Sequence, residues 1–165
     1  MNPGHVYLIG MPGSGKSAVG RALAERLDMP FVDLDEEIER EAGQTIPEIF
    51  REQGERGFRE RERASVVRVA DGPPSVVACG GGAVLREDNR QLIRSTGRVV
   101  WLRSAPDRLW ERVKRGAGRP LIKGPVDVQR LERERRSIYG EVAQHRVASE
   151  GPPEDVARSI AEVLT

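Results

Sequence analysis

The sequence predicts an α/β fold in which a parallel sheet of five strands is covered by helices on both faces. Three observations support this fold class. Five short apolar runs alternate with longer segments of helical periodicity. A glycine-rich loop at residues 10–17 joins the first of these runs directly to the first helix. The run 75–79 is continuously apolar, as expected of a strand that is buried on both faces of a sheet.

The loop Gly10–Ser17 fits the pattern G-x-x-x-x-G-K-[ST] of a phosphate-binding loop (P-loop). It follows the expected strand 6–9 and precedes a helix whose apolar positions are Val19, Leu23 and Leu27. Its glycines let backbone N–H groups converge on phosphate oxygens at the start of that helix. Lys16 can reach the terminal phosphates, and the Ser17 hydroxyl can ligate Mg²⁺. The alternative is a glycine-rich turn that binds nothing, but the fixed positions and both flanks favour the P-loop.

Two carboxylates follow the short second strand, residues 31–33. Asp33 and Asp35 stand at its carboxyl end, which is the edge of an open α/β sheet where ligands bind. They are therefore well placed for chemistry. The alternative is that Asp35 only caps the next helix, 36–42. Capping explains one aspartate and not both, so the pattern favours a functional role.

A charged helical region comes next, from residue 45 to residue 70. A capping box of Thr45 and Glu48 starts a short helix that ends near Gly54. A second helix covers about 55–70, and one side of it carries Phe58, Glu62, Val66 and Val69, with Arg59 beside them. Two interpretations stay open for Arg59. It belongs either to a solvated, charge-rich helix or to a pocket in which Glu62 holds it in position.

Three consecutive glycines, Gly80, Gly81 and Gly82, follow the strand 75–79. Without side chains, they let a ligand approach the backbone closely. The alternative is a tight strand–helix turn, although such a turn needs only one or two glycines. Cys79 is expected to be a small core residue.

The next elements are a helix at 86–95, a strand at 98–102 and a helix that carries Leu109, Trp110 and Val113. The segment 104–107 is expected to cap this last helix. The segment 114–125 is basic, rich in glycine and poor in core residues. It is either a mobile lid or a plain surface loop.

The helix expected at 126–142 has an arginine on its apolar face. Arg135 stands seven residues after Val128, in the stripe that Leu131, Ile138 and Val142 continue. An arginine on a buried face must find an anion, either internal or bound. Its neighbour Arg136 is expected to be solvated. The chain closes with a strand at 145–149 and an amphipathic helix that carries Val156, Ile160 and Val163.

Composition limits the function further. The chain has 165 residues, 38% apolar and 32% charged, which suits one globular domain with a real core. With 27 basic and 26 acidic residues, it has no net field to recruit nucleic acid or an anionic membrane. Its single cysteine excludes intramolecular disulfides and cysteine–metal clusters. No apolar run approaches the length of a membrane span and no secretion signal opens the chain, so we expect a cytoplasmic protein.

The layout is that of a small-molecule kinase. Two segments extend beyond the core, at roughly 35–62 and 114–124. The first can hold an acceptor, and the second can close over ATP. The motifs together resemble shikimate kinase, of the nucleoside-monophosphate-kinase-like P-loop group, over essentially the whole chain. The residues that carry the resemblance are Gly10–Ser17, Asp33, Asp35, 45–50 with 54–55, Phe58, Arg59, Glu62, 80–84, 119–121, Arg135 and Tyr139.

The resemblance implies a three-layer α/β/α sandwich with strand order 2-3-1-4-5 and ATP-dependent phosphorylation of the shikimate 3-hydroxyl, a step toward chorismate. It implies Mg²⁺, bound by Ser17 directly and by Asp33 through water, and we expect a monomer. The catalytic residues that it implies are Lys16, Asp35 and Arg119. The ATP-binding residues would be Gly13, Ser14, Gly15, Lys16, Ser17, Ala18, Arg112 and Arg119. The shikimate-binding residues would be Asp35, Phe58, Arg59, Glu62, Gly80, Gly81, Gly82, Arg119 and Arg135.

Individual roles follow from the same resemblance. Asp35 would bind shikimate hydroxyls and take the proton, while Arg59 and Arg135 would grip the shikimate carboxylate. Arg112 would stack on adenine, and Arg119 of the lid would stabilise the transferring charge. Physical chemistry agrees with the carboxylate clamp, because two guanidinium forks orient one carboxylate and explain an inward Arg135.

The chain departs from the family pattern at three places. Ala18 stands where the family usually has Thr, Ser137-Ile138 precedes Tyr139 where Pro-Leu is usual, and 151–153 lacks a basic residue beside adenine. Two alternative functions are another kinase on this scaffold, such as gluconate kinase, and a non-catalytic nucleotide-binding regulator. The regulator is disfavoured because the chain retains Lys16, Asp35 and the acceptor arginines.

Overall fold

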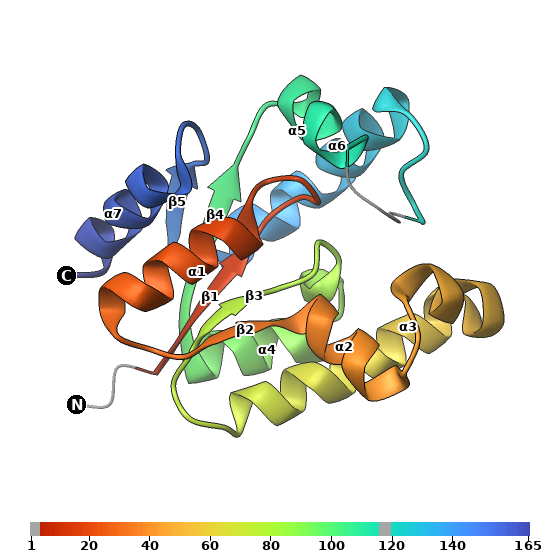
Figure 1. The fold of residues 1–165 in the computed structure, drawn as a ribbon, viewed down its shortest axis with the longest axis horizontal. Coiled ribbons are helices and arrows are strands. Elements are labelled where there is room, and N and C mark those ends of the chain that lie inside the picture. The colour runs from red at the N-terminus through yellow and green to blue at the C-terminus, as the bar shows by residue number, and fades with distance from the viewer. Residues whose placement is uncertain (1–3, 116–119) are drawn as a thin grey trace.

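The computed structural model describes residues 4–115 and 120–165, which form one sheet flanked by helices (Figure 1). All strand pairs are parallel, and the strand order is β2-β3-β1-β4-β5. The strands are β1 (His5–Ile9), β2 (Phe31–Asp33), β3 (Val76–Ala78), β4 (Gly97–Arg103) and β5 (His145–Ala148). The predicted fold class and strand order are confirmed.

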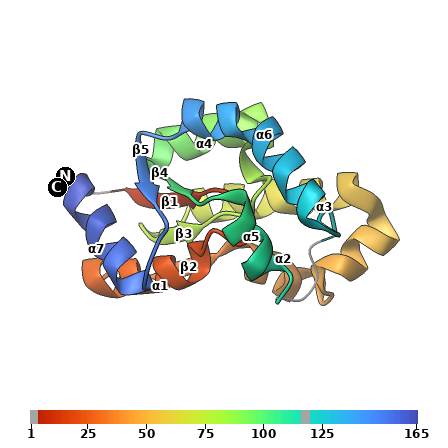
Figure 2. The same cartoon turned by 90° about the horizontal axis from the view of Figure 1, so that it is seen from above.

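Helices cover both faces of this sheet, with α1 and α7 on one side and α4 and α6 on the other (Figure 2). The helices are α1 (Lys16–Leu27), α2 (Leu34–Ala42), α3 (Ile46–Ala70), α4 (Glu87–Thr96), α5 (Pro106–Val113), α6 (Pro125–Val142) and α7 (Pro153–Leu164). Within the two described ranges, none of them combines the length and apolarity needed to cross a bilayer.

The two-residue period of β1 separates the core into two layers. Val6 and Leu8 pack with the apolar faces of α1 and α7. Tyr7 and Ile9 point to the opposite face, where they join a larger cluster that includes residues of α3, α4 and α6. Full burial of an aliphatic or aromatic side chain stabilises a fold by about 1.5–3 kcal/mol. Strands that are apolar on both faces therefore hold the sheet between the two helical layers.

Strand pairing explains where β4 departs from its expected bounds. β4 extends one residue beyond 98–102 at each end, because Gly97 pairs with His5 and Arg103 pairs with Ala148. β3, in contrast, covers only the centre of the expected run 75–79. A short 3₁₀ helix at Ala83–Leu85, which the sequence analysis did not predict, follows the three glycines.

One predicted helix start and one predicted helix cap are wrong. α2 begins at Leu34 instead of residue 36, because the side chain of Asp33 caps it. No side chain caps α5, although a cap was expected from the segment 104–107. The Ser104 hydroxyl donates instead to the carbonyl of Ser149, 3.4 Å away, so it joins β4 to the end of β5.

The predicted break near Gly54 is confirmed, since Gly54 has φ 72° and ψ −179° inside α3. Only glycine adopts such a backbone without strain, so the two halves of α3 meet at a kink. In α6 the buried stripe includes Tyr139, whereas Ile138 is only partly buried. In α7 Val156 and Ile160 are buried, but Val163 is 41% exposed.

Candidate active site

The P-loop forms the wall of a cavity at the carboxyl edge of the sheet. Gly13 and Gly15 have φ values of 86° and 89°, in the left-handed region that favours glycine. The first helical bond of α1 runs from Val19 N to Gly15 O, which leaves the amides of the first turn to face a ligand. The cavity, here called the P-loop cavity, is lined by Gly13, Gly15, Lys16, Ser17, Ala18, Asp33, Asp35, Ala78, Cys79, Gly81 and Arg112.

Lys16 folds back onto its own loop. Its Nζ donates to the carbonyl oxygens of Gly10 and Met11, at 2.8 and 2.9 Å. A cationic ammonium is thereby held at the P-loop cavity, where a phosphate would lie.

Asp33, and not Asp35, caps α2. Its Oδ1 accepts from the N–H groups of Asp35 and Glu36 at 3.0 and 3.2 Å, and its Oδ2 accepts from the Ser17 hydroxyl. The interpretation of Asp35 as a simple cap is therefore wrong. The carboxylate of Asp35 is not consumed by capping and lines the cavity.

The pair of Ser17 and Asp33 fits Mg²⁺. A hydroxyl and a carboxylate oxygen, the hard donors that this ion prefers, lie side by side at the P-loop cavity. Within the described residues there is no cluster of three or more His, Cys, Asp or Glu side chains that would hold a metal by itself. An Mg²⁺ ion here would therefore take its other ligands from water and nucleotide phosphate.

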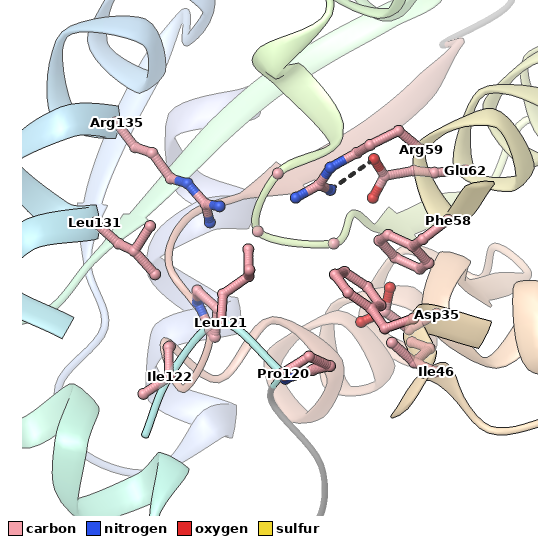
Figure 3. Close-up of a pocket in the computed structure, with 15 residues that line it drawn as sticks. Asp35, Ile46, Phe58, Arg59, Glu62, Pro120, Leu121, Ile122, Leu131 and Arg135 are labelled. Atoms are coloured by element: carbon pink, nitrogen blue, oxygen red, sulfur yellow. Dashed lines mark hydrogen bonds and ion pairs between the residues drawn. The ribbon is translucent and has the colours of Figure 1, made fainter. Parts of the chain in front are cut away.

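A second cavity, here called the acceptor cavity and drawn in Figure 3, shares lining residues with the first. Asp35 and Gly81 line both cavities. A group bound in one cavity therefore meets a group bound in the other beside the Asp35 carboxylate. The acceptor cavity is lined by Pro12, Asp35, Ile46, Phe50, Phe58, Arg59, Glu62, Gly80, Gly81, Gly82, Pro120, Leu121, Ile122, Leu131 and Arg135.

Arg59 faces the acceptor cavity, so of the two interpretations left open the pocket is correct. Its Nη1 donates to Glu62 Oε1 at 2.9 Å, and its Nη2 lies 3.4 Å from Glu55 Oε2. The guanidinium also lies over the Phe58 ring, 5.2 Å from the centroid. Phe58 packs in turn against Phe50, with ring centroids 4.9 Å apart. Three contacts thus fix the direction of Arg59.

Glu62 is 1% exposed, which is unusual for a carboxylate. Burial raises its pKa above the ordinary value, the adjacent Arg59 charge opposes that rise, and the Asp35 carboxylate adds to it. The cost of burying this charge is offset by the ion pair with Arg59. The pair therefore acts as one unit at the wall of the cavity.

Arg135 is 4% exposed on α6, as its place in the apolar stripe predicts. Its guanidinium and that of Arg59 enter the acceptor cavity from opposite walls and point toward one another (Figure 3). Across residues 4–115 and 120–165, no carboxylate forms an ion pair with Arg135. Two cations that converge on one buried space favour binding of an anion there. The neighbouring Arg136 is exposed, as predicted, and pairs with Glu132 at 2.7 Å.

The three glycines are required by space rather than by backbone conformation, since none has a positive φ. A Cβ at Gly80 would lie 2.8 Å from Asp35 Oδ1 and 3.0 Å from Glu62 Oε2. A Cβ at Gly81 would lie 2.7 Å from Pro12 Cδ, and one at Gly82 would overlap the Arg59 guanidinium. A side chain at any of the three positions would therefore displace Pro12 or a charged side chain of the cavity wall.

Two further residues were predicted to bind the nucleotide, and the structure describes one of them. Arg112 is exposed and donates from Nη1 to Gly13 O at 3.0 Å, so it touches the P-loop. Arg119 lies outside the described residues. It directly precedes Pro120, which lines the acceptor cavity.

The sequence analysis assigned no role at the site to two buried polar residues, although it named Tyr139 among those that carry the resemblance. Tyr139 donates from Oη to Gly81 O at 2.5 Å, and Ser149 donates from Oγ to Ser14 O at 2.5 Å. The position of Tyr139 four residues after Arg135 was a usable signal, because residues i and i+4 share one face of a helix. For Ser149, 135 residues from its partner, no local pattern was available. Leu131, an apolar lining residue, was predicted as a core position only.

Comparisons with known proteins agree with this geometry. A model of the shikimate kinase family matches residues 12–165. The chain is 46% identical to a shikimate kinase of Symbiobacterium thermophilum, with 97% of this chain and 95% of that protein covered. A solved shikimate kinase from Acinetobacter baumannii, in complex with shikimate, superposes with a TM-score of 0.95 at 36% identity and covers 98% of this chain and 92% of its own.

A more distant solved structure shares the fold alone. It is a gluconokinase from Sinorhizobium meliloti, with a TM-score of 0.66 and 24% identity, covering 99% of this chain and 92% of that one.

Proposed function

The chain belongs to the shikimate kinase family, and on that premise we propose how its residues perform the family's reaction. As an ATP-dependent kinase of this family, it transfers the ATP γ-phosphoryl group to the 3-hydroxyl of shikimate, giving shikimate 3-phosphate and ADP. The single observation that supports the roles below is the pair of adjoining cavities that share Asp35 and Gly81.

Shikimate occupies the acceptor cavity with its carboxylate between Arg59 and Arg135. Both guanidinium groups point into this space, and Glu62 holds Arg59 from behind. Two forks on one carboxylate orient the ring as well as binding it. Phe58 closes one wall, and the chain Gly80–Gly82 passes close to the acceptor because it carries no side chains.

ATP lies in the P-loop cavity, with its phosphates against the amides at the start of α1. The shikimate 3-hydroxyl oxygen attacks the γ-phosphorus, the bond from that phosphorus to the β-phosphate oxygen breaks, and the Asp35 carboxylate accepts the hydroxyl proton. Asp35 is suited to this role because it borders both cavities. Positioning supplies most of the rate in such a transfer, and the proton acceptor contributes less.

Lys16 and Arg119 neutralise the charge that develops on the transferring group, and a bound Mg²⁺ ion would add to this neutralisation. Ser17 and Asp33 would hold the Mg²⁺ ion, Ser17 directly and Asp33 through water, and the ion would neutralise the β- and γ-phosphates. Lys16 already stands at the cavity through its bonds to Gly10 and Met11.

The segments that leave the core close the site. Residues 35–62 form the acceptor-binding region and 114–124 the lid of a single kinase domain. Pro120, Leu121 and Ile122 of the lid line the acceptor cavity, which supports its role in keeping water from the γ-phosphate.

Both cavities are lined by one copy of the chain, so we propose that the enzyme acts as a monomer in the cytoplasm, where ATP is available. Light scattering after size-exclusion chromatography tests the monomer, and cell fractionation tests the location.

A coupled assay of ADP release tests the function. Saturable turnover is expected with shikimate and Mg·ATP, and none above the background ATPase with gluconate or AMP. Turnover with gluconate or AMP but not with shikimate would contradict the proposal.

A further inference from the structure

Side chains hold four carbonyl groups of the loop Gly10–Ser17. Lys16 binds those of Gly10 and Met11, and Arg112 binds that of Gly13. The fourth, on Ser14, accepts the hydroxyl of Ser149. Lys16, Arg112 and Ser14 were predicted at the nucleotide site, but nothing assigned a role to Ser149.

Ser149 is 3% exposed and is fixed on all sides at the end of β5. Its N–H donates to Arg103 O at 2.7 Å, which continues the pairing of β5 with β4. Its carbonyl accepts from Ser104 Oγ and from Arg112 Nη2, each at 3.4 Å. Its hydroxyl is the part of the residue that contacts the P-loop. Through this contact the P-loop is hydrogen-bonded to a residue that the sheet holds in place.

The bond to Ser14 O sets the orientation of one particular peptide group. In a trans peptide the C=O and the following N–H point in opposite directions. Holding Ser14 O toward Ser149 therefore turns Gly15 N–H away from Ser149. Gly15 has φ 89°, caps α1 and lines the P-loop cavity. As a glycine, it has little conformational preference of its own.

We propose that Ser149 is a positioning residue for the nucleotide, acting through Ser14 O to aim the Gly15 N–H at a phosphate of ATP. The inference rests on the proposed function, because it takes the P-loop cavity to be the ATP site. Loss of the Ser149 hydroxyl frees the peptide group between Ser14 and Gly15 to rotate. The Gly15 N–H must then be ordered each time a nucleotide binds, which weakens binding. The effect falls on ATP and not on shikimate, since Ser149 does not line the acceptor cavity.

Four variants separate the hydroxyl from the shape of the side chain. Ser149→Ala removes the donor, while Ser149→Val and Ser149→Thr add similar volume and differ in the hydroxyl alone. Ser104→Ala is the matched control, because Ser104 Oγ binds the same residue but makes no hydrogen bond to the P-loop. KM for ATP and for shikimate, ADP affinity by calorimetry and the nucleotide-free Tm are measured for each variant.

Ser149→Ala and Ser149→Val are expected to raise the KM for ATP and the Kd for ADP about fivefold to tenfold, as for a lost hydrogen bond. Their KM for shikimate stays within about twofold of wild type on the same argument, and Ser149→Thr restores nucleotide affinity. Wild-type nucleotide affinity in Ser149→Ala overturns the inference. So does equal impairment in Ser149→Thr and Ser149→Val, or an equal loss in Ser104→Ala.

Failure of the proposed function can be distinguished from failure of this inference. If the proposed function is wrong, the wild-type enzyme itself shows no shikimate-dependent release of ADP. ADP calorimetry still reports the role of Ser149 there, because it needs no acceptor.

Discussion

The Tyr139 hydroxyl donates to the carbonyl of Gly81 at 2.5 Å and so ties helix α6 to the three-glycine loop. The ring is 1% exposed, and burial raises the pKa of Tyr139 to about 12, so the phenol remains protonated and donates. The same hydroxyl lies 3.9 Å from Met11 Sδ in the P-loop. Gly81 borders both cavities, so this one bond steadies the place where they meet.

Tyr139→Phe is expected to lower the free energy of unfolding by about 0.5–1.5 kcal/mol, the usual net contribution of one hydrogen bond, because the Gly81 carbonyl loses its partner. KM for shikimate should rise about fivefold, as a freer Gly81 binds the acceptor less well. Urea unfolding and steady-state kinetics measure the two effects.

Tyr7→Phe is the matched control. Tyr7 is equally buried, its hydroxyl pairs with Thr96 Oγ1 at 2.7 Å, and neither residue lines either cavity. It should lose stability without a change in KM. Equal changes in KM in the two variants would show that Tyr139 acts through general stability alone.

Asp35→Asn should lower kcat about a hundredfold, the usual contribution of a proton acceptor. ATP binding should survive, because Lys16 and the P-loop amides are untouched. Single-turnover kinetics and ADP calorimetry measure the two quantities. Glu36→Gln, at the exposed neighbouring residue that pairs with Arg21, is the control and should stay fully active. Full activity in Asp35→Asn would remove Asp35 from the chemical step.

Arg135→Ala should raise KM for shikimate about tenfold to a hundredfold, the range for losing a charge-assisted hydrogen bond. KM for ATP should change far less, because Arg135 does not line the P-loop cavity. Arg136→Ala is the control, because the adjacent arginine is exposed and pairs with Glu132. Similar increases in both KM values would count against a carboxylate clamp.

Glu62 makes stability depend on pH. Its folded-state pKa lies above the unfolded one, so the folded protein binds the extra proton. The free energy of unfolding therefore falls as pH rises from the unfolded pKa, near 4.5, to the higher folded value. Glu62→Gln should abolish this part of the slope, and urea unfolding between about pH 4 and pH 7 measures it.

Two comparisons make the Glu62 prediction specific. Glu60→Gln, at an exposed residue that pairs with Arg86, should retain the wild-type slope. KM for shikimate should rise in Glu62→Gln alone, because Arg59 loses its charged partner. An unchanged slope in Glu62→Gln would mean that Glu62 is ionised over this whole range.

Arg119→Ala should lower kcat about a hundredfold and leave the affinity for ADP nearly unchanged, as expected of a group that meets charge mainly in the transition state. Rapid-quench kinetics and ADP calorimetry separate the two effects. Arg115→Ala is the control within the same basic segment, since Arg115 is exposed and lies 3.9 Å from Glu111. An unchanged rate in Arg119→Ala would remove the lid arginine from the mechanism.

Local sequence does not determine which aspartate caps the helix after β2. Asp33 and Asp35 are both good capping residues, and the sequence analysis treated Asp35 as the alternative cap. The structure selects Asp33 because α2 starts two residues earlier, directly from the strand, and Asp33 also accepts from Ser17. The choice depends on a contact between residues sixteen positions apart, which no periodicity records.

Local patterns by themselves determined the class of fold, the phosphate loop and the inward arginine of α6. Each depends on spacings within a few residues: glycines and lysine in the loop, apolar periods in strands and helices. Only the tertiary structure decided which side chains meet. Arg59 and Arg135 share a cavity, Tyr139 reaches Gly81 and Ser149 reaches Ser14 because the sheet order brings distant segments together. Such contacts depend on how whole helices and strands pack together, and no single segment of the sequence determines that packing.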